Sequence, residues 1–120
     1  MKYAVLLLFQ FKVIKKNQLN KKRICEERIY HIESSSSECA YNKAEILGKD
    51  EEFSYQDGNK LVIFEFIGIQ EMIELTDLED ENLVWSRYIE KLLPMERKDK
   101  LIPKKGKLTV FKQNKHKLKI

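Results

Sequence analysis

Four consecutive residues, Cys25-Glu26-Glu27-Arg28, form the most conspicuous cluster of reactive and charged side chains in the sequence. The surrounding residues favour a strand, and successive side chains on a strand point to opposite faces. Glu27 is therefore predicted to share a face with Cys25, and Arg28 to share the other with Glu26. Such groups could bind a partner or a charged ligand, or they could form ordinary ion pairs on the sheet, with Cys25 as a small core residue. The candidate partner-binding residues are Glu26, Glu27, Arg28, Trp85 and Arg87.

The other side chains that could do chemistry are too few or too far apart. Cys25 and His31 are six residues apart on one predicted strand, which is about 20 Å at ~3.3 Å per residue, so they cannot bind one metal ion. The two cysteines and two histidines have no paired zinc-site spacing. The serines at 34–37 precede a predicted helix and are better explained as helix caps, and the Gly-rich loop of a phosphate site is absent. We therefore predict no catalytic residue, no metal and no cofactor.

The net charge of +4 conceals a strong asymmetry along the chain. Residues 1–90 carry 12 basic and 17 acidic groups, a net of −5, whereas residues 91–120 carry 11 basic and 2 acidic groups, a net of +9. The basic segment could bind nucleic-acid phosphates or an acidic protein, or it could fold against the acidic region 71–81. Its single arginine and single aromatic residue supply little for reading or stacking bases. The candidates for such binding are Arg97, Lys98, Lys104, Lys105 and Lys107.

Length and composition indicate one packed domain in a reducing compartment. The chain has 120 residues, of which 42% are apolar and 35% charged, which suits one core under a solvated surface. The apolar run at 4–9 is short and lacks a cleavage site, so it predicts a strand and not a signal peptide. No segment approaches the ~20 apolar residues that a membrane span needs. We therefore expect no membrane partner. Because the chain has only two cysteines, we expect a cytoplasmic protein.

The pattern of apolar residues predicts one sheet and one helix. Alternating apolar side chains indicate strands at 3–13, 24–33, 53–56, 61–75 and 83–89, with the inward face of the second left open. The fold class is therefore α+β, a single antiparallel sheet in the order ββαβββ with the helix packed on one face. We assign residues 1–90 to this domain and residues 91–120 to a basic C-terminal extension. One helix cannot cover both faces, so the opposite face must be solvated, covered by the extension or buried in a partner.

Local signals place the helix and the turns. Ser35 and Glu38 form a capping box that predicts a helix over residues 36–47, and Gly48 is placed to end it in the left-handed conformation. Asp57-Gly58 predicts a hairpin turn with a loop of two residues or more, and Gly68 predicts a bulge or bend. Residues 108–111 have the composition of a further short strand.

Several short runs of the sequence resemble a known family. These runs are Tyr3-Ala4-Val5-Leu6-Leu7, Cys25-Glu26-Glu27-Arg28-Ile29, Lys43-Ala44, Asp57-Gly58, Glu65-Phe66-Ile67-Gly68-Ile69 and Val84-Trp85-Ser86-Arg87. Together, over about residues 2–90, they resemble the small bacterial proteins grouped as domain of unknown function four-two-eight-eight. The resemblance implies a one-domain boundary that leaves the basic tail outside. It implies no activity and no site residue.

Two functions follow as expectations. The first is a non-catalytic protein-binding module of the bacterial cytoplasm, acting with a protein partner or as a homo-oligomer, with an immunity or regulatory protein as one such role. The second is a nucleic-acid-associated protein that binds phosphates through its lysine-rich tail. An enzyme acting around residues 25–28 is a third class, for which the sequence names no substrate.

Overall fold

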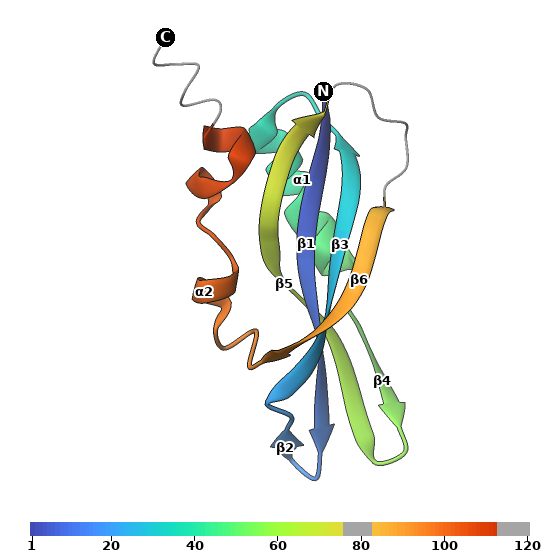
Figure 1. Ribbon diagram of the computed structural model, residues 1–120. Coiled ribbons are helices and arrows are strands. Elements are labelled where there is room, and N and C mark those ends of the chain that lie inside the picture. The colour runs from blue at the N-terminus through green and yellow to red at the C-terminus, as the bar shows by residue number, and fades with distance from the viewer. Residues whose placement is uncertain (76–82, 113–120) are drawn as a thin grey trace.

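The computed structural model describes residues 1–75 and 83–112, apart from the side chains of residues 83–87. One antiparallel sheet dominates it, with a single long helix behind the sheet in the view of Figure 1. The order across the sheet is β4-β5-β1-β3-β6, and the short β2 pairs with the end of β1. The predicted α+β class, with one sheet and a helix on one face, is confirmed. The elements are β1 (Lys2–Lys15), β2 (Gln18–Leu19), β3 (Lys22–Glu33), α1 (Ser37–Asp50), β4 (Phe53–Asp57), β5 (Lys60–Leu75), β6 (Leu83–Leu92), α2 (Lys98–Leu101) and the 3-10 turn η1 (Lys105–Lys107).

The central strand β1 sets the register of the sheet. It pairs with β5 along its whole length and with β3 from Lys2 to Gln10. The ladder between β1 and β5 shifts register twice, on either side of the two neighbouring pairs Leu7–Ile69 and Leu8–Gly68. The bend predicted at Gly68 is therefore confirmed, and bulges of this kind increase the twist of the strands. Figure 1 shows the resulting twist about midway along the sheet.

Two tight hairpins form the lower end of the sheet in Figure 1. Lys16 and Asn17, with φ of 52° and 63°, make a two-residue turn between β1 and β2. Paired positive φ angles are typical of such turns. The predicted hairpin at Asp57-Gly58 is confirmed. Its loop has two residues, because Asp57 still pairs with Lys60 and Gly58 supplies the positive φ of 65°.

Helix α1 differs from its prediction at both ends. The N-cap is Ser36, whose hydroxyl accepts a hydrogen bond from the Cys39 N–H at 3.1 Å, so the predicted Ser35–Glu38 capping box is wrong by one residue. The prediction that Gly48 ends the helix is also wrong, because the helix continues to Asp50. A Cβ on Gly48 would lie 2.6 Å from the Phe66 ring. This glycine therefore allows α1 to lie close against β5.

Each face of the sheet has its own apolar core. On the helix side, alternate residues of β1 from Tyr3 to Phe9 pack with Ala40 and Ala44 of α1. The other face has a smaller cluster centred on Leu8, Cys25 and Ile67.

The basic extension contributes to both cores as far as it is described. Leu108 and Val110 are buried in the helix-side core, and Met95, Leu101 and Ile102 cover the cluster on the opposite face. The short strand predicted at 108–111 is wrong, because residues 109–112 are helical. The described part of the extension is thus docked on the domain, and the face opposite α1 is covered by it at this cluster.

The helix is much shorter than the strands that it covers. Its 14 residues span about 21 Å at ~1.5 Å per residue, whereas the 16 residues of β5 span about 50 Å. Because α1 packs against the upper part of the sheet in Figure 1, the lower part of the helix-side face extends beyond it.

Candidate functional site

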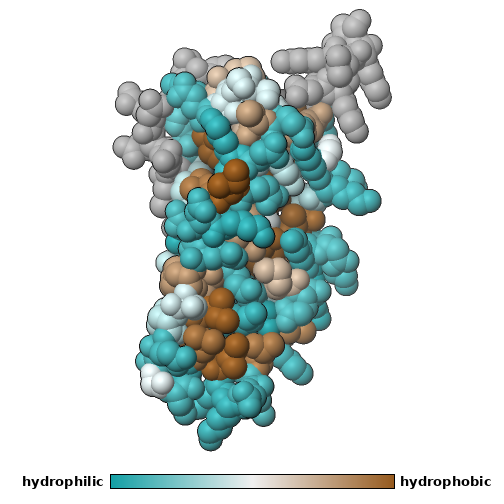
Figure 2. Space-filling model, turned by 180° about the vertical axis from the view of Figure 1, so that it is seen from behind, coloured by the Kyte–Doolittle hydropathy of each residue, from teal (hydrophilic) through white to brown (hydrophobic). Residues whose placement is uncertain are grey.

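The uncovered part of the helix-side face carries a group of aromatic side chains, which we call the aromatic platform. Its members are Phe11, Phe53, Tyr55, Phe64 and Tyr88. Phe64 lies directly opposite both Phe11 and Phe53 in the strand pairing, so all three share one face. Figure 2 views this face and shows hydrophobic residues gathered on the lower part of the molecule.

The rings of the platform pack against one another and still leave a large apolar surface. The Phe64 ring is fully buried beneath Phe53 and Phe11, at centroid distances of 4.9 and 4.8 Å. Phe53 and Tyr55 remain 48% exposed and Tyr88 63% exposed. Their mutual stacking favours this arrangement of the exposed rings.

Arg28 connects this platform to the C-terminal end of α1. Its guanidinium group lies 5.1 Å from the ring centroids of Phe9 and Phe64. It donates hydrogen bonds to the Glu26 carboxylate at 2.9 Å and the Tyr30 hydroxyl at 3.0 Å, and it lies 3.4 Å from the Glu51 carboxylate. The expectation that Glu26 and Arg28 share a face is confirmed.

Burial and hydrogen bonding shift the pKa of Arg28 in opposite directions. Burial by itself would lower the pKa of Arg28, but the hydrogen bonds to Glu26 and Tyr30 outweigh it and raise the pKa above its ordinary value. The guanidinium group therefore stays charged at any physiological pH. Its Nε is buried without a hydrogen-bond partner among the described residues, so the charge is held by ion pairs and ring faces.

The other two residues of the Cys25-Glu26-Glu27-Arg28 cluster lie on the opposite face of the sheet. Cys25 and Glu27 are buried on the face opposite the platform. Burial raises the pKa of the Cys25 thiol to about 11, so this cysteine stays protonated and unreactive at neutral pH. On β6, Trp85 and Arg87 pair with Ile29 and Glu27 in the backbone register, and their side chains lie outside the described part of the chain.

Four of the five basic candidates of the tail are exposed, and the fifth is engaged within the domain. Arg97, Lys98, Lys104 and Lys107 are exposed, on α2 and around η1. Lys105 instead forms an ion pair with Glu38 of α1. Its ammonium group lies 4.5 Å from the Tyr41 ring centroid and 5.5 Å from that of Phe111. The single aromatic residue of the tail is therefore already engaged within the domain.

Arg23 fastens the start of the tail to the sheet. Its guanidinium group, only 1% exposed, donates to both carboxylate oxygens of Glu96 at 2.6 and 2.8 Å. Further bonds run to the Gln10 side chain at 3.1 Å and to the Asn20 carbonyl at 2.7 Å. The hydrogen bond from Arg23 lowers the pKa of Glu96. No local sequence pattern indicates this pair, which joins residues 73 positions apart.

Glu71 fastens the end of the described tail. Its carboxylate accepts hydrogen bonds from the Thr109 N–H at 2.7 Å, the Thr109 hydroxyl at 2.8 Å and the Met72 N–H at 2.9 Å. Burial by itself would raise the pKa of Glu71, but these hydrogen bonds outweigh it and lower the pKa. The carboxylate also takes up a free N–H at the start of the helical turn 109–112, as a helix cap would.

We predict that the docked tail loosens in acid, because the carboxylates of Glu71 and Glu96 hold it on the domain. A carboxyl group whose pKa is lower in the folded chain binds fewer protons there than in the unfolded chain, so acidification favours unfolding. The contributions of Glu71 and Glu96 are complete above pH ~4.5 and are lost as the pH falls through their lowered values. We expect urea midpoints measured between pH 7 and pH 3 to fall less steeply for the variant Glu71→Gln with Glu96→Gln than for the wild type. Equal slopes would show that neither carboxylate is held by the folded chain.

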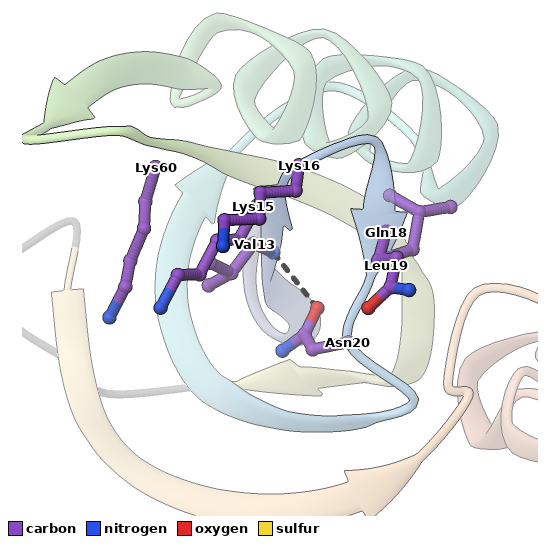
Figure 3. Close-up of a pocket in the computed structure, with 7 residues that line it drawn as sticks. All are labelled: Val13, Lys15, Lys16, Gln18, Leu19, Asn20 and Lys60. Atoms are coloured by element: carbon purple, nitrogen blue, oxygen red, sulfur yellow. Dashed lines mark hydrogen bonds between the residues drawn. The ribbon is translucent and has the colours of Figure 1, made fainter.

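A shallow hollow of about 500 Å³ lies between the two hairpin tips (Figure 3). Its lining residues are Val13, Lys15, Lys16, Gln18, Leu19, Asn20 and Lys60. The Asn20 carboxamide oxygen already accepts the Val13 N–H at 2.9 Å. The lysines are exposed to solvent, so the hollow makes a basic end for the platform.

Two further properties apply to the described residues. They contain no group of three or more His, Cys, Asp or Glu side chains placed to hold a metal ion. No helix among them is long and apolar enough to cross a membrane.

The fold and surface together define a small α+β protein whose most prominent exposed feature is an apolar aromatic surface on a sheet. The chain belongs to the family DUF4288, a domain of unknown function, whose model matches residues 3–86. This match ends within β6, before the docked tail. Comparison with curated proteins finds no match, and comparison with solved structures finds none either.

Proposed function

We propose that this protein is a non-catalytic protein-binding module and that the aromatic platform is its binding surface. The observation that carries the proposal is that α1 leaves this part of the sheet uncovered while Phe53, Tyr55 and Tyr88 remain about half exposed or more. Contiguous apolar patches on soluble proteins usually mark interaction sites. Aromatic residues and arginine are also the residue types that dominate the energy of protein interfaces.

The location of this surface differs from the one that the sequence suggested. The sequence left the face opposite α1 to be solvated, covered by the extension or buried in a partner, and the tail covers the apolar cluster of this face through Met95, Leu101 and Ile102. The support for a partner therefore comes from the same face as the helix, below its C-terminal end. An immunity or a regulatory protein would use a surface of this kind to bind its target without chemistry.

Nucleic-acid binding through the tail is the weaker candidate. Four of the five basic candidates in the tail are exposed, which suits contact with phosphates. However, Lys105 is paired with Glu38, and the Phe111 ring is covered by Lys105. No described side chain of the tail is left to stack on a base.

The proposal is tested by removing the exposed rings. In the variant Phe53→Ser with Tyr88→Ser, we expect affinity for a partner captured from the native cell to fall at least about tenfold, because interface hot spots each contribute more than ~1 kcal/mol. Folding should persist, since about half of Phe53 and 63% of Tyr88 are exposed. Binding is measured by calorimetric titration, and self-association by sedimentation velocity.

Ile46→Ser is the matched control, because Ile46 is 63% exposed on the outer side of α1, away from the platform. It should bind as the wild type does. A wild-type protein that stays monomeric and captures no stoichiometric partner would contradict the proposal. So would equal binding by the double variant.

A further inference from the structure

We infer that the platform binds a second copy of this chain, with the two platforms face to face around a two-fold axis. The inference rests on the proposed function, because it names the occupant of the same surface. It is carried by the distribution of charge around the platform.

The end of the platform nearest α1 is acidic. Asp50, Glu51 and Glu52 follow one another where the helix ends. The Glu52 carboxylate accepts the Phe66 N–H at 2.9 Å, which places this group beside β5 at the upper border of the platform. Asp50 and Glu52 are exposed, as is Lys49 beside them, and Glu51 is paired with Arg28. The acidic residues outnumber the basic ones here, so this end is negative on balance.

The other end of the platform is basic. Lys15 and Lys60 lie directly opposite each other in the pairing of β1 and β5, and Lys16 follows in the hairpin turn. All three are exposed and line the hollow of Figure 3. Asp57 of β4 lies opposite Lys60 and is also exposed, so this end carries three positive charges and one negative charge and is basic on balance. Phe66 and Lys60 are six residues apart on β5, so the acidic and basic ends are separated by about 20 Å.

A surface with this layout is complementary to itself. In a two-fold interface the same patch meets its own copy in the opposite direction. An axis through the middle of the platform, near Phe53 and Phe64, brings the basic end of each copy onto the acidic end of the other and the exposed rings into the centre. Two such contacts form for each dimer, and neither end meets its own sign.

The size of the surface predicts a weak dimer. Five strands at ~4.8 Å spacing give a width of about 19 Å, so the patch is roughly 20 Å in each direction and lies at the low end of specific interfaces. We expect the dimer to dissociate on dilution and in high salt, because the charged ends are exposed to solvent.

The test is charge reversal read by sedimentation velocity over a concentration series. The tip variant carries Lys15→Glu and Lys60→Glu, and the helix-end variant carries Asp50→Lys and Glu52→Lys. Each alone places like charges at both contacts, so we expect its dimer dissociation constant to rise about tenfold or more. All four substitutions in one chain should restore the wild-type value, and a mixture of the two variants should form a heterodimer. Thermal melting checks that each variant is folded.

Three outcomes would overturn the inference. These are a wild type that is monomeric throughout the series, variants that associate like the wild type, or a mixture that forms no heterodimer. The protein-binding proposal has a separate readout, because capture of a different partner through Phe53 and Tyr88 would leave it standing while the inference on a second copy fails.

Discussion

Replacing Leu108 by alanine is expected to lower the free energy of unfolding by about 3 kcal/mol, within the range for large-to-small changes in a core. Leu108 belongs to the basic extension, yet its side chain is only 1% exposed and lies in the helix-side core together with Val110. Removing its branched end would leave a cavity between elements that cannot easily collapse, because the sheet beneath is held by long strand pairs. Urea denaturation followed by circular dichroism measures the change.

Lys107→Ala is the control for the neighbouring exposed position and should change stability by no more than ~0.5 kcal/mol. If Leu108→Ala matched it, the extension would not be docked in solution.

The same packing means that the tail cannot be deleted without disturbing the core. Deleting residues 94–120 would remove Leu108 and Val110 from the core, so tests of its lysines require point substitutions.

Replacing Glu96 by alanine is expected to destabilise the protein by about 2–3 kcal/mol. Removing one partner of a buried ion pair leaves the other charge without compensation, which typically costs ~3–5 kcal/mol. The Arg23 side chain is 1% exposed, but the Glu96 side chain is 45% exposed, so water can reach part of the vacated site and reduce the cost. The change is measured by urea denaturation at pH 7.

Glu90→Ala provides the comparison. Glu90 lies 3.9 Å from Lys22, and both side chains are mostly exposed, so its loss should cost no more than ~0.5 kcal/mol. The double variant Arg23→Met with Glu96→Ala should be less destabilised than Glu96→Ala alone, because no charge then remains buried. A double variant that is the less stable of the two would show that the packing of Arg23 matters more than its charge.

The sequence by itself determined the features that depend on neighbours along the chain. Alternation of apolar residues located the long strands, because every second side chain of a strand faces the same core. The same periodicity placed Glu26 and Arg28 on one face. The serines marked the start of α1 to within one residue, and Asp57-Gly58 located a hairpin, because both signals act over three or four residues.

The tertiary structure alone decided the features that depend on contacts between distant segments. Gly48 had the type and position of a helix terminator, but the approach of Phe66 from β5 gave it another role. Residues 108–111 have the composition of a strand, but the Glu71 carboxylate caps a helical turn at residues 109–112 and Val110 is buried in the core. The ion pair between Arg23 and Glu96 joins two segments far apart in the chain, so no pattern of neighbouring residues could predict it.

The same distinction explains where the open surface lies. The sequence predicted one helix and several strands. Because one helix cannot cover both faces of a sheet, it left open whether the other face is solvated, covered by the extension or buried in a partner. Which surface stays open depends on the difference in length between α1 and β5 and on the route of the tail across the other face. Both are set by packing between segments far apart in the chain, so only the folded structure could place the aromatic platform below the end of α1.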